Sequence, residues 1–162
     1  MQSITLDAID LQLLDLLQHD AAQSNQALAE RVHVSPPTCL RRVKRLHDVG
    51  LIERQVALLQ PDRLAALQGH GLAAIVEVAL DRQGAEHLDA FEARAVAEDE
   101  VQQCWRVSPG PDFVLIVHTR DMPGYLALSQ RLFTQDANVR NVKSFFSVHR
   151  AKFETKVPLA LI

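Results

Sequence analysis

The chain has 162 residues, of which 48% are apolar and 5% aromatic, so it can form one large or two small domains with mainly aliphatic cores. Its net charge of -3 excludes a protein that is basic over its whole surface, but not a local cationic patch. The apolar stretches, such as 113–117, are far shorter than the roughly 20 residues of a membrane-spanning helix, so we expect no membrane partner. Asp7 and Asp10 replace the cations of an export signal, and Cys39 and Cys104 are far apart. Both features predict a location in the reducing cytoplasm, without a disulfide framework.

Positive charge is concentrated in one short segment. Residues 31–47 carry five Lys or Arg and no acidic residue, whereas the first twenty residues carry four Asp and no Lys or Arg. A run of charge is most often a solvated helix face. The alternative is a surface for an anionic partner, and the arrangement of the cations on their helix bears on the choice.

Three short helices are predicted in the first fifty residues. Apolar residues at positions 9, 13, 16 and 17 have helical spacing, and Asp7 is a suitable N-cap for the helix that contains them. Ser24 is expected to cap a second helix and Ser35 a third. Gly50 is expected to end the third helix in the left-handed conformation.

The third helix carries its cations together. Because Pro37 lacks an N–H, we expect the Ser35 hydroxyl to bond the amide of Thr38. At 100° per residue, the apolar side chains cluster on one side, and a threonine and three arginines cluster mostly on the other. The residues of this second cluster are Thr38, Arg41, Arg42 and Arg45. A helix, a tight turn and a second helix with a cationic outer face are typical of a helix-turn-helix that reads the DNA major groove. A three-helix scaffold without DNA binding is the alternative.

A second domain is predicted after a connector. Residues 53–59 are expected to be extended, and the stretch up to Gly71 is expected to be a linker. The predicted strands cover 72–80, 101–107, 113–119, 139–149 and 153–157, and the predicted helices cover 86–97 and a segment from Pro123. The order β-α-β-β-α-β, before the last edge strand, is that of a ferredoxin-like domain.

The helices of such a domain cover one face of the sheet. The other face is predicted to present Ile75, one of the neighbours Phe113 and Val114, and one of the neighbours Phe145 and Phe146, depending on register. So much apolar surface is not expected to remain in contact with water. We therefore predict that a second subunit covers this face.

Several spaced motifs extend along nearly the whole chain. They are LDAIDLQLL at 6–14, LAERV at 28–32, SPPTCLRRVKRLHDVGLI at 35–52, VALLQP at 56–61, DF at 112–113, DM at 121–122 and TKVPL at 155–159. Their order and spacing resemble the Lrp/AsnC family of bacterial and archaeal transcription regulators. The resemblance implies an α+β protein with a winged helix-turn-helix DNA-binding domain at 1–52 and a hinge strand and linker at 53–70. A ferredoxin-like βαββαβ domain at 71–162 would then bind effector and form oligomers.

The resemblance also implies functional residues. The DNA-binding residues would be Ser35, Thr38, Arg41, Arg42 and Arg45. The effector-binding residues would be Trp105, Gly110, Asp112, Met122 and Phe145. In the family the effector turn usually reads Gly-x-x-Asp, whereas here Pro109 stands at that glycine position and Gly110 follows; Ala22 replaces the usual Arg before the second helix. The implied partners are double-stranded DNA, a small amino acid bound between dimers, and further copies of the chain in a homodimer, tetramer or octamer.

Each effector-site residue also has a purely structural interpretation. The Asp112 carboxylate could order its own turn, and Trp105 could belong to a core. Met122 could pack at the start of a helix, and Phe145 could pack in the sheet. The sequence leaves these alternatives open.

The predicted function is a cytoplasmic, sequence-specific DNA-binding transcription regulator that responds to a small amino acid and is not an enzyme. One alternative is an enzyme on the same scaffold, similar to tetrapyrrole decarboxylases, for which Arg106, His118 and Arg120 would have to converge near the turn. Another is an amino-acid-sensing partner that has lost DNA binding. The histidines and cysteines lack metal-ligand spacing, so we predict no metal and no cofactor besides the effector.

Overall fold

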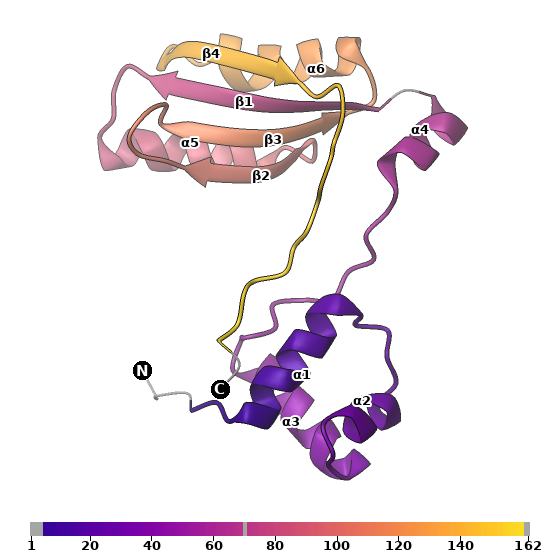
Figure 1. Ribbon diagram of the computed structural model, residues 1–162. Helices are drawn as coiled ribbons and strands as arrows, with labels where there is room; N and C mark the ends of the chain where they lie inside the picture. The colour runs from indigo at the N-terminus through magenta and orange to yellow at the C-terminus, as the bar shows by residue number, and fades with distance from the viewer. Residues whose placement is uncertain (1–4, 70, 161–162) are drawn as a thin grey trace. The chain divides into compact units, whose positions relative to one another are not determined.

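The computed structural model describes residues 5–69 and 71–160 (Figure 1). The chain divides into two compact units, one formed by residues up to Leu58 together with those from Lys152 onward, and the other by Leu59–Ala151. The chain therefore passes between the units twice, at 58–59 and at 151–152. The domain boundaries predicted from the sequence, after residues 52 and 70, stay predictions.

The first unit contains the three expected helices, α1 (Ala8–His19), α2 (Asn25–Arg31) and α3 (Pro36–Asp48). At the start of α1 the Asp7 carboxylate accepts a hydrogen bond from the Asp10 N–H at 2.9 Å, and the Asp10 carboxylate accepts one from the Asp7 N–H at 3.2 Å. This reciprocal capping box satisfies two amides that a helix start leaves unpaired. The predicted Asp7 N-cap is confirmed.

The turns between these helices use special backbone positions. Ser24 caps α2 by accepting from the Ala27 N–H at 3.2 Å, as predicted, and Gly50 has the expected left-handed conformation, with φ 76°. His33, in the turn between α2 and α3, also has a positive φ, 55°, which is uncommon for a residue with a Cβ. The expected bond from the Thr38 amide to Ser35 is wrong: the Ser35 hydroxyl pairs with the Thr38 hydroxyl at 2.9 Å.

The region after α3 differs from the prediction in two elements. No strand is formed by the described residues of the first unit, so these residues show no wing, and the predicted hinge strand has no ladder partner at 53–60. Residues predicted as a linker instead include α4 (Pro61–Gln68). A proline such as Pro61 can end an extended segment, but it fits the first helical position equally well, where no N–H is needed.

The second unit is a four-stranded antiparallel sheet with helices on one face (Figure 1). Besides α4, its elements are β1 (Leu72–Leu80), α5 (Ala85–Ala97), β2 (Val101–Arg106), β3 (Phe113–Thr119), α6 (Met122–Ser129), a π-helical segment η1 (Gln130–Thr134) and β4 (Val139–Phe146). The strand order is β2-β3-β1-β4. This order and the β-α-β-β-α-β sequence of elements confirm the predicted ferredoxin-like domain.

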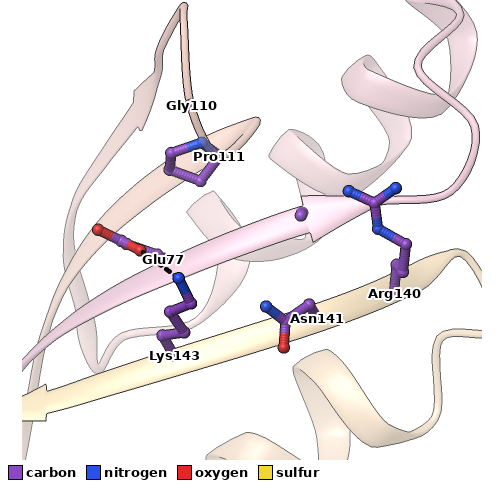
Figure 2. Close-up of a pocket in the computed structure, with 7 residues that line it drawn as sticks. Glu77, Gly110, Pro111, Arg140, Asn141 and Lys143 are labelled. Carbon is purple, nitrogen blue, oxygen red and sulfur yellow. Dashed lines mark ion pairs between the residues drawn. The ribbon is translucent and has the colours of Figure 1, made fainter.

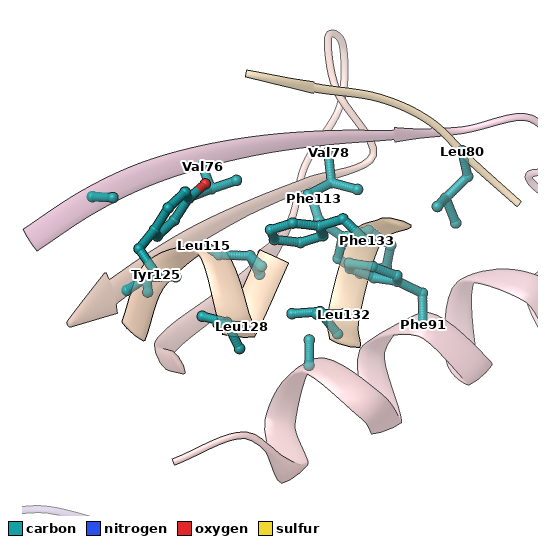
Figure 3. Packing of buried hydrophobic residues seen from close by; sticks show 13 residues of the cluster. Val76, Val78, Leu80, Phe91, Phe113, Leu115, Tyr125, Leu128, Leu132 and Phe133 are labelled. Carbon is teal, nitrogen blue, oxygen red and sulfur yellow. The ribbon is translucent and has the colours of Figure 1, made fainter. Parts of the chain in front are cut away.

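The core lies between the sheet and its helices (Figure 3). Alternate residues of β1 and β3 face it, and the fully buried side chains include Val76, Val78, Leu80, Phe91, Phe113, Leu115, Leu128 and Leu132. The Phe91 and Phe113 ring centroids are 4.8 Å apart. Burial of aliphatic and aromatic side chains of this size stabilises a fold by roughly 1.5–3 kcal/mol each.

The strand register settles which apolar residues face away from the helices. Phe113 is buried against α5, and Phe146 packs edge-on against the Tyr125 ring of α6 at 5.0 Å, so their neighbours Val114 and Phe145 point to the open face. Ile75 pairs with Phe145 across the strands. Their exposed fractions, 46% for Ile75 and 52% for Phe145, leave a large apolar area uncovered in the single chain.

The C-terminal segment is not part of the sheet. β4 ends at Phe146 rather than at residue 149, and the predicted edge strand at 153–157 is absent from the described residues. The Val157 backbone instead bonds the Gln18 side chain of α1. None of the described helices is long and apolar enough to cross a membrane.

Candidate DNA-binding and effector sites

The outward face of α3 is defined by its exposed side chains. Pro37, Leu40, Arg41 and Lys44 are all exposed and share one stripe of the helix, at spacings of three or four residues. Leu40 is 60% exposed, which is unusual for a leucine on a packed helix. A stripe that combines cations with an apolar side chain can contact both phosphates and base edges in a major groove.

Arg42 and Arg45 do not belong to this stripe. The Arg42 guanidinium donates to the Asp7 carboxylate at 2.8 Å and to the Asp10 carboxylate at 2.9 Å, and Arg45 donates to Asp10 at 2.5 Å. Both arginines therefore pair with acidic residues at the start of α1, while 43% of the Arg45 side chain is still accessible, and their contact with DNA stays a prediction. A helical wheel groups residues by face, but it does not say how the helix is rotated against its neighbour.

The acceptor of both arginines is deeply buried. Asp10 is 1% exposed, so its charge has lost most of its hydration and depends on these partners. The neighbouring Asp7 has its pKa lowered, first by the hydrogen bond from the Asp10 N–H and then by Arg42. The carboxylates of α1 in turn raise the pKa of Arg42 above its usual value. These contacts hold α3 against α1 and so fix the stripe that faces outward.

The predicted DNA-binding residues thus fall into two groups. Ser35, Thr38 and Arg41 lie at the start of α3 or on its outward side, while Arg42 and Arg45 form ion pairs with the buried Asp10 of α1. Sequence reasoning left out Lys44 and Leu40. Lys44 was visible in the local charge excess, but the exposure of Leu40 depends on the packing of α3 against α1.

The turn between β2 and β3 is ordered by Asp112. Its carboxylate accepts the Leu80 N–H at 2.6 Å, and its backbone N–H donates to the Val78 carbonyl at 2.9 Å. Gly110 has φ 128°, a conformation that favours glycine over residues with a side chain. These contacts support the structural interpretation of Asp112, and a role toward an effector stays a prediction.

A pocket of about 270 Å³ lies beside this turn, on the open face of the sheet (Figure 2). It is lined by Glu77, Ala79, Gly110, Pro111, Arg140, Asn141 and Lys143. The Lys143 ammonium is 4.0 Å from the Glu77 carboxylate. The Arg140 guanidinium has no hydrogen-bond or ion-pair partner within the part of the chain that the structure describes. The pocket thus offers both signs of charge to a small polar molecule.

The five predicted effector residues are not all close together. Trp105 lies on the open face, 58% exposed, and pairs with Val114 next to the turn that holds Gly110 and Asp112. Phe145 lies further along the open face, opposite Ile75. Met122 starts α6 at the other end of the seven-residue strand β3, roughly 20 Å away at about 3.3 Å per residue. One subunit therefore does not bring Met122 to the turn.

The residues of the alternative enzyme site do not converge. Arg106 points to the helix side of the sheet, where it forms ion pairs with Asp89 at 2.8 Å and Glu92 at 2.7 Å. His118, by strand alternation, lies on the open face, and burial together with the charge of Arg150 lowers its pKa. Among the described residues no cluster of three or more His, Cys, Asp or Glu could hold a metal ion.

A helix-turn-helix with an exposed cationic stripe, joined to a ferredoxin-like domain with a charged pocket, defines a two-domain DNA-binding regulator. Residues 6–47 match the AsnC-type helix-turn-helix domain, and residues 73–157 match the Lrp/AsnC ligand binding domain. The chain belongs to the Lrp/AsnC family and is a DNA-binding transcription regulator.

Individual relatives agree with this assignment. The chain is 36% identical over 155 residues to an HTH-type transcriptional regulator of Haemophilus influenzae, covering 96% of this chain and 90% of the relative. It is 34% identical to the DNA-binding transcriptional activator DecR of Escherichia coli, covering 95% and 99% of the two chains. A transcriptional regulator of Neisseria meningitidis, solved in complex with L-Met, is 30% identical, with a TM-score of 0.83 and coverage of 95% and 97%. The family and these relatives are regulators rather than enzymes, which removes the decarboxylase alternative.

Proposed function

We propose that this regulator changes its DNA affinity or its assembly when an amino acid binds near the turn 108–112. The observation that carries the proposal is the charged pocket beside that turn, in a domain that matches the Lrp/AsnC ligand binding domain. The structure similar to this chain that contains L-Met supports an amino acid as the class of ligand. Identification of the amino acid requires a binding experiment.

The pocket chemistry suits a zwitterion. The free guanidinium of Arg140 can bind a carboxylate, for which its planar donors are well matched. The Glu77 carboxylate can bind an ammonium group, at present neutralised by Lys143 at 4.0 Å. Trp105 and the apolar open face nearby can contact the side chain of the ligand. We propose that Gly110 and Asp112 act mainly by shaping the turn that closes one side of this pocket.

DNA binding is proposed to use the outward stripe of α3. Arg41 and Lys44 would bind phosphates or guanine, and the exposed Leu40 side chain would contact a thymine methyl group. Ser35 and Thr38, at the start of the helix, would contact the DNA backbone. Arg42 and Arg45 are proposed to act indirectly, by fixing the rotation of α3.

The open face supports an assembly of several subunits. Ile75, Trp105 and Phe145 are each 46% or more exposed on one face of the sheet, which is an unusual apolar area for a monomer. We propose a homodimer through this face, with tetramers or octamers formed from dimers, in the cytoplasm. In such an assembly Met122 of one subunit can approach a turn of another, which a single chain does not allow.

The test is a titration of the purified protein with each of the twenty amino acids, followed by the emission of Trp105, the sole tryptophan. We expect a saturable change with one or a few amino acids, and at least a tenfold loss of affinity in Arg140→Ala. Asp112→Asn is the control for the proposal that Asp112 acts by shaping the turn. Its amide keeps an acceptor for the Leu80 N–H while it removes the charge, so the affinity should change less than in Arg140→Ala. No response to any amino acid from the folded protein would refute the proposal.

A further inference from the structure

The last described residues of the chain form part of the DNA-binding unit. We use the name C-terminal tail for residues 152–160, which follow β4 after a short connection. The tail contacts α1 near its C-terminal end, one to three turns from the capping box that holds α3. No strand or helix is formed within these residues, so side-chain contacts hold them in place.

The first contact is a pair of hydrogen bonds between one side chain and one peptide group. The Gln18 amide donates from Nε2 to the Val157 carbonyl at 3.2 Å, and its Oε1 accepts the Val157 N–H at 2.6 Å. A primary amide and a backbone residue have matching donors and acceptors, so both polar groups of Val157 are satisfied at once. The next residue, Pro158, could not form the same pair, because it has no N–H to donate.

The second contact is ionic. The Lys156 ammonium lies 2.7 Å from the Asp15 carboxylate, and it lowers the pKa of that carboxyl. The same ammonium is 3.3 Å from Nε2 of His19, whose Nδ1 lies 2.8 Å from the Asp15 carbonyl. A neutral His19 with its proton on Nδ1 donates to that carbonyl and accepts from Lys156, so one tautomer satisfies both contacts.

We propose that α1 carries a docking surface for the chain's own C-terminal tail, formed by Asp15, Gln18 and His19, and that the docked tail strengthens DNA binding. The tail gives the DNA-binding unit a second covalent connection to the ligand-binding domain, in addition to the one after Leu58. A second connection removes conformational freedom that DNA binding would otherwise have to remove. It also gives a route by which a change at β4 can reach α1, and from α1 the ion pairs of Asp10 reach α3.

The proposal is tested by charge exchange at the ionic contact. Lys156→Glu places two carboxylates together, and we expect it to weaken binding to a DNA duplex selected from a random library by the wild-type protein, by about three- to tenfold. We also expect faster proteolysis of the tail in the absence of DNA. Adding Asp15→Lys to Lys156→Glu restores an ion pair, so the double variant should recover both properties.

Two controls separate docking from a general change of charge. Lys152→Glu makes the same charge change in the tail at a residue with no hydrogen bond or ion pair among the described residues. Gln18→Ala removes both bonds to Val157, and Gln12→Ala is its control on the same helix. If Lys156→Glu behaves like Lys152→Glu in both assays, or if Gln18→Ala behaves like Gln12→Ala, the docking proposal is wrong. Failure of the double variant to recover would also overturn it.

A crosslinking experiment identifies the chain that supplies the tail. Cysteines at positions 15 and 156, joined by a short bismaleimide, should give a product with the mass of one chain. The wild-type protein, with Cys39 buried and Cys104 half-buried, is the background control. A product with twice the mass of the chain would show that a second copy supplies the tail and would overturn the assignment to the same chain.

Discussion

Replacement of Arg42 by alanine tests whether this residue holds α3 in place or contacts DNA. In the structure its guanidinium bonds the buried Asp10 at 2.9 Å and the exposed Asp7 at 2.8 Å, and 24% of its side chain is accessible. We expect Arg42→Ala to destabilise the DNA-binding unit. The same replacement at Arg41, which is exposed on the outward stripe, should leave the stability nearly unchanged.

The magnitude follows from the two contacts. A hydrogen bond between charged groups contributes roughly 1.5–3 kcal/mol, and the exposed contact with Asp7 adds at most about 1 kcal/mol. The stability lost in Arg42→Ala should remain below the roughly 3–5 kcal/mol expected for an unpaired buried charge, because Arg45 still binds Asp10 at 2.5 Å. We therefore expect about 2–3 kcal/mol. For a unit of this size that corresponds to a decrease of roughly 10 °C or more in the unfolding temperature.

Two optical signals separate the units in one assay. Trp105 lies in the ligand-binding domain, so its fluorescence follows that domain, whereas circular dichroism also follows the helices of the DNA-binding unit. Arg42→Ala should lower the midpoint temperature of the transition followed by circular dichroism and leave the midpoint of the fluorescence transition unchanged. Arg41→Ala should instead weaken DNA binding by roughly tenfold at constant stability, since one base or phosphate contact contributes about 1–3 kcal/mol.

The opposite pattern would refute this reasoning. If Arg42→Ala kept the unfolding temperature of the wild type and lost DNA affinity, Arg42 would be a DNA contact, as the helical wheel suggested. The outward stripe would then be assigned wrongly. DNA binding should be measured well below the unfolding temperature of each variant, so that loss of folded protein does not imitate loss of a contact.

Three further predictions concern the turns and the pH response. His33→Gly should stabilise the DNA-binding unit by about 0.5–1 kcal/mol in denaturant unfolding, because His33 has a positive φ of 55° that glycine adopts without strain. A destabilised variant would mean that the imidazole makes a compensating contact. Asp112→Ala should destabilise the ligand-binding domain by about 1–2 kcal/mol, because it leaves the Leu80 N–H without its acceptor, and Asp112→Asn should destabilise it less. Equal losses of stability in the two variants would contradict this role. Burial lowers the pKa of His118, so the unfolded chain binds a proton more readily, and the Trp105 unfolding transition should lose stability as pH falls below about 6.5, the ordinary value. His118→Gln should remove that part of the pH dependence, and an unchanged profile would contradict the assignment.

The local elements could be predicted from the sequence because their signals are local. Asp7 and Ser24 were recognised as caps, and Gly50 as the left-handed end of α3, because each meets a backbone requirement of its own turn. Apolar patterning predicted the four strands that form, together with a fifth at 153–157 that does not, and the order of strands and helices predicted the ferredoxin-like domain. α4 was missed because Pro61 is equally compatible with a helix start and with the end of an extended segment.

The sites depended on contacts between residues far apart in the sequence. The wheel grouped Arg42 and Arg45 with Arg41, but Asp10, more than thirty residues earlier, draws the first two toward α1 and leaves the third exposed. In the same way the pocket beside Gly110 is completed by Arg140 from β4, and the tail contacts Gln18 rather than the sheet. A local pattern specifies backbone conformation, but the rotation of a helix and the neighbours of a charge are chosen by packing and desolvation of the whole chain.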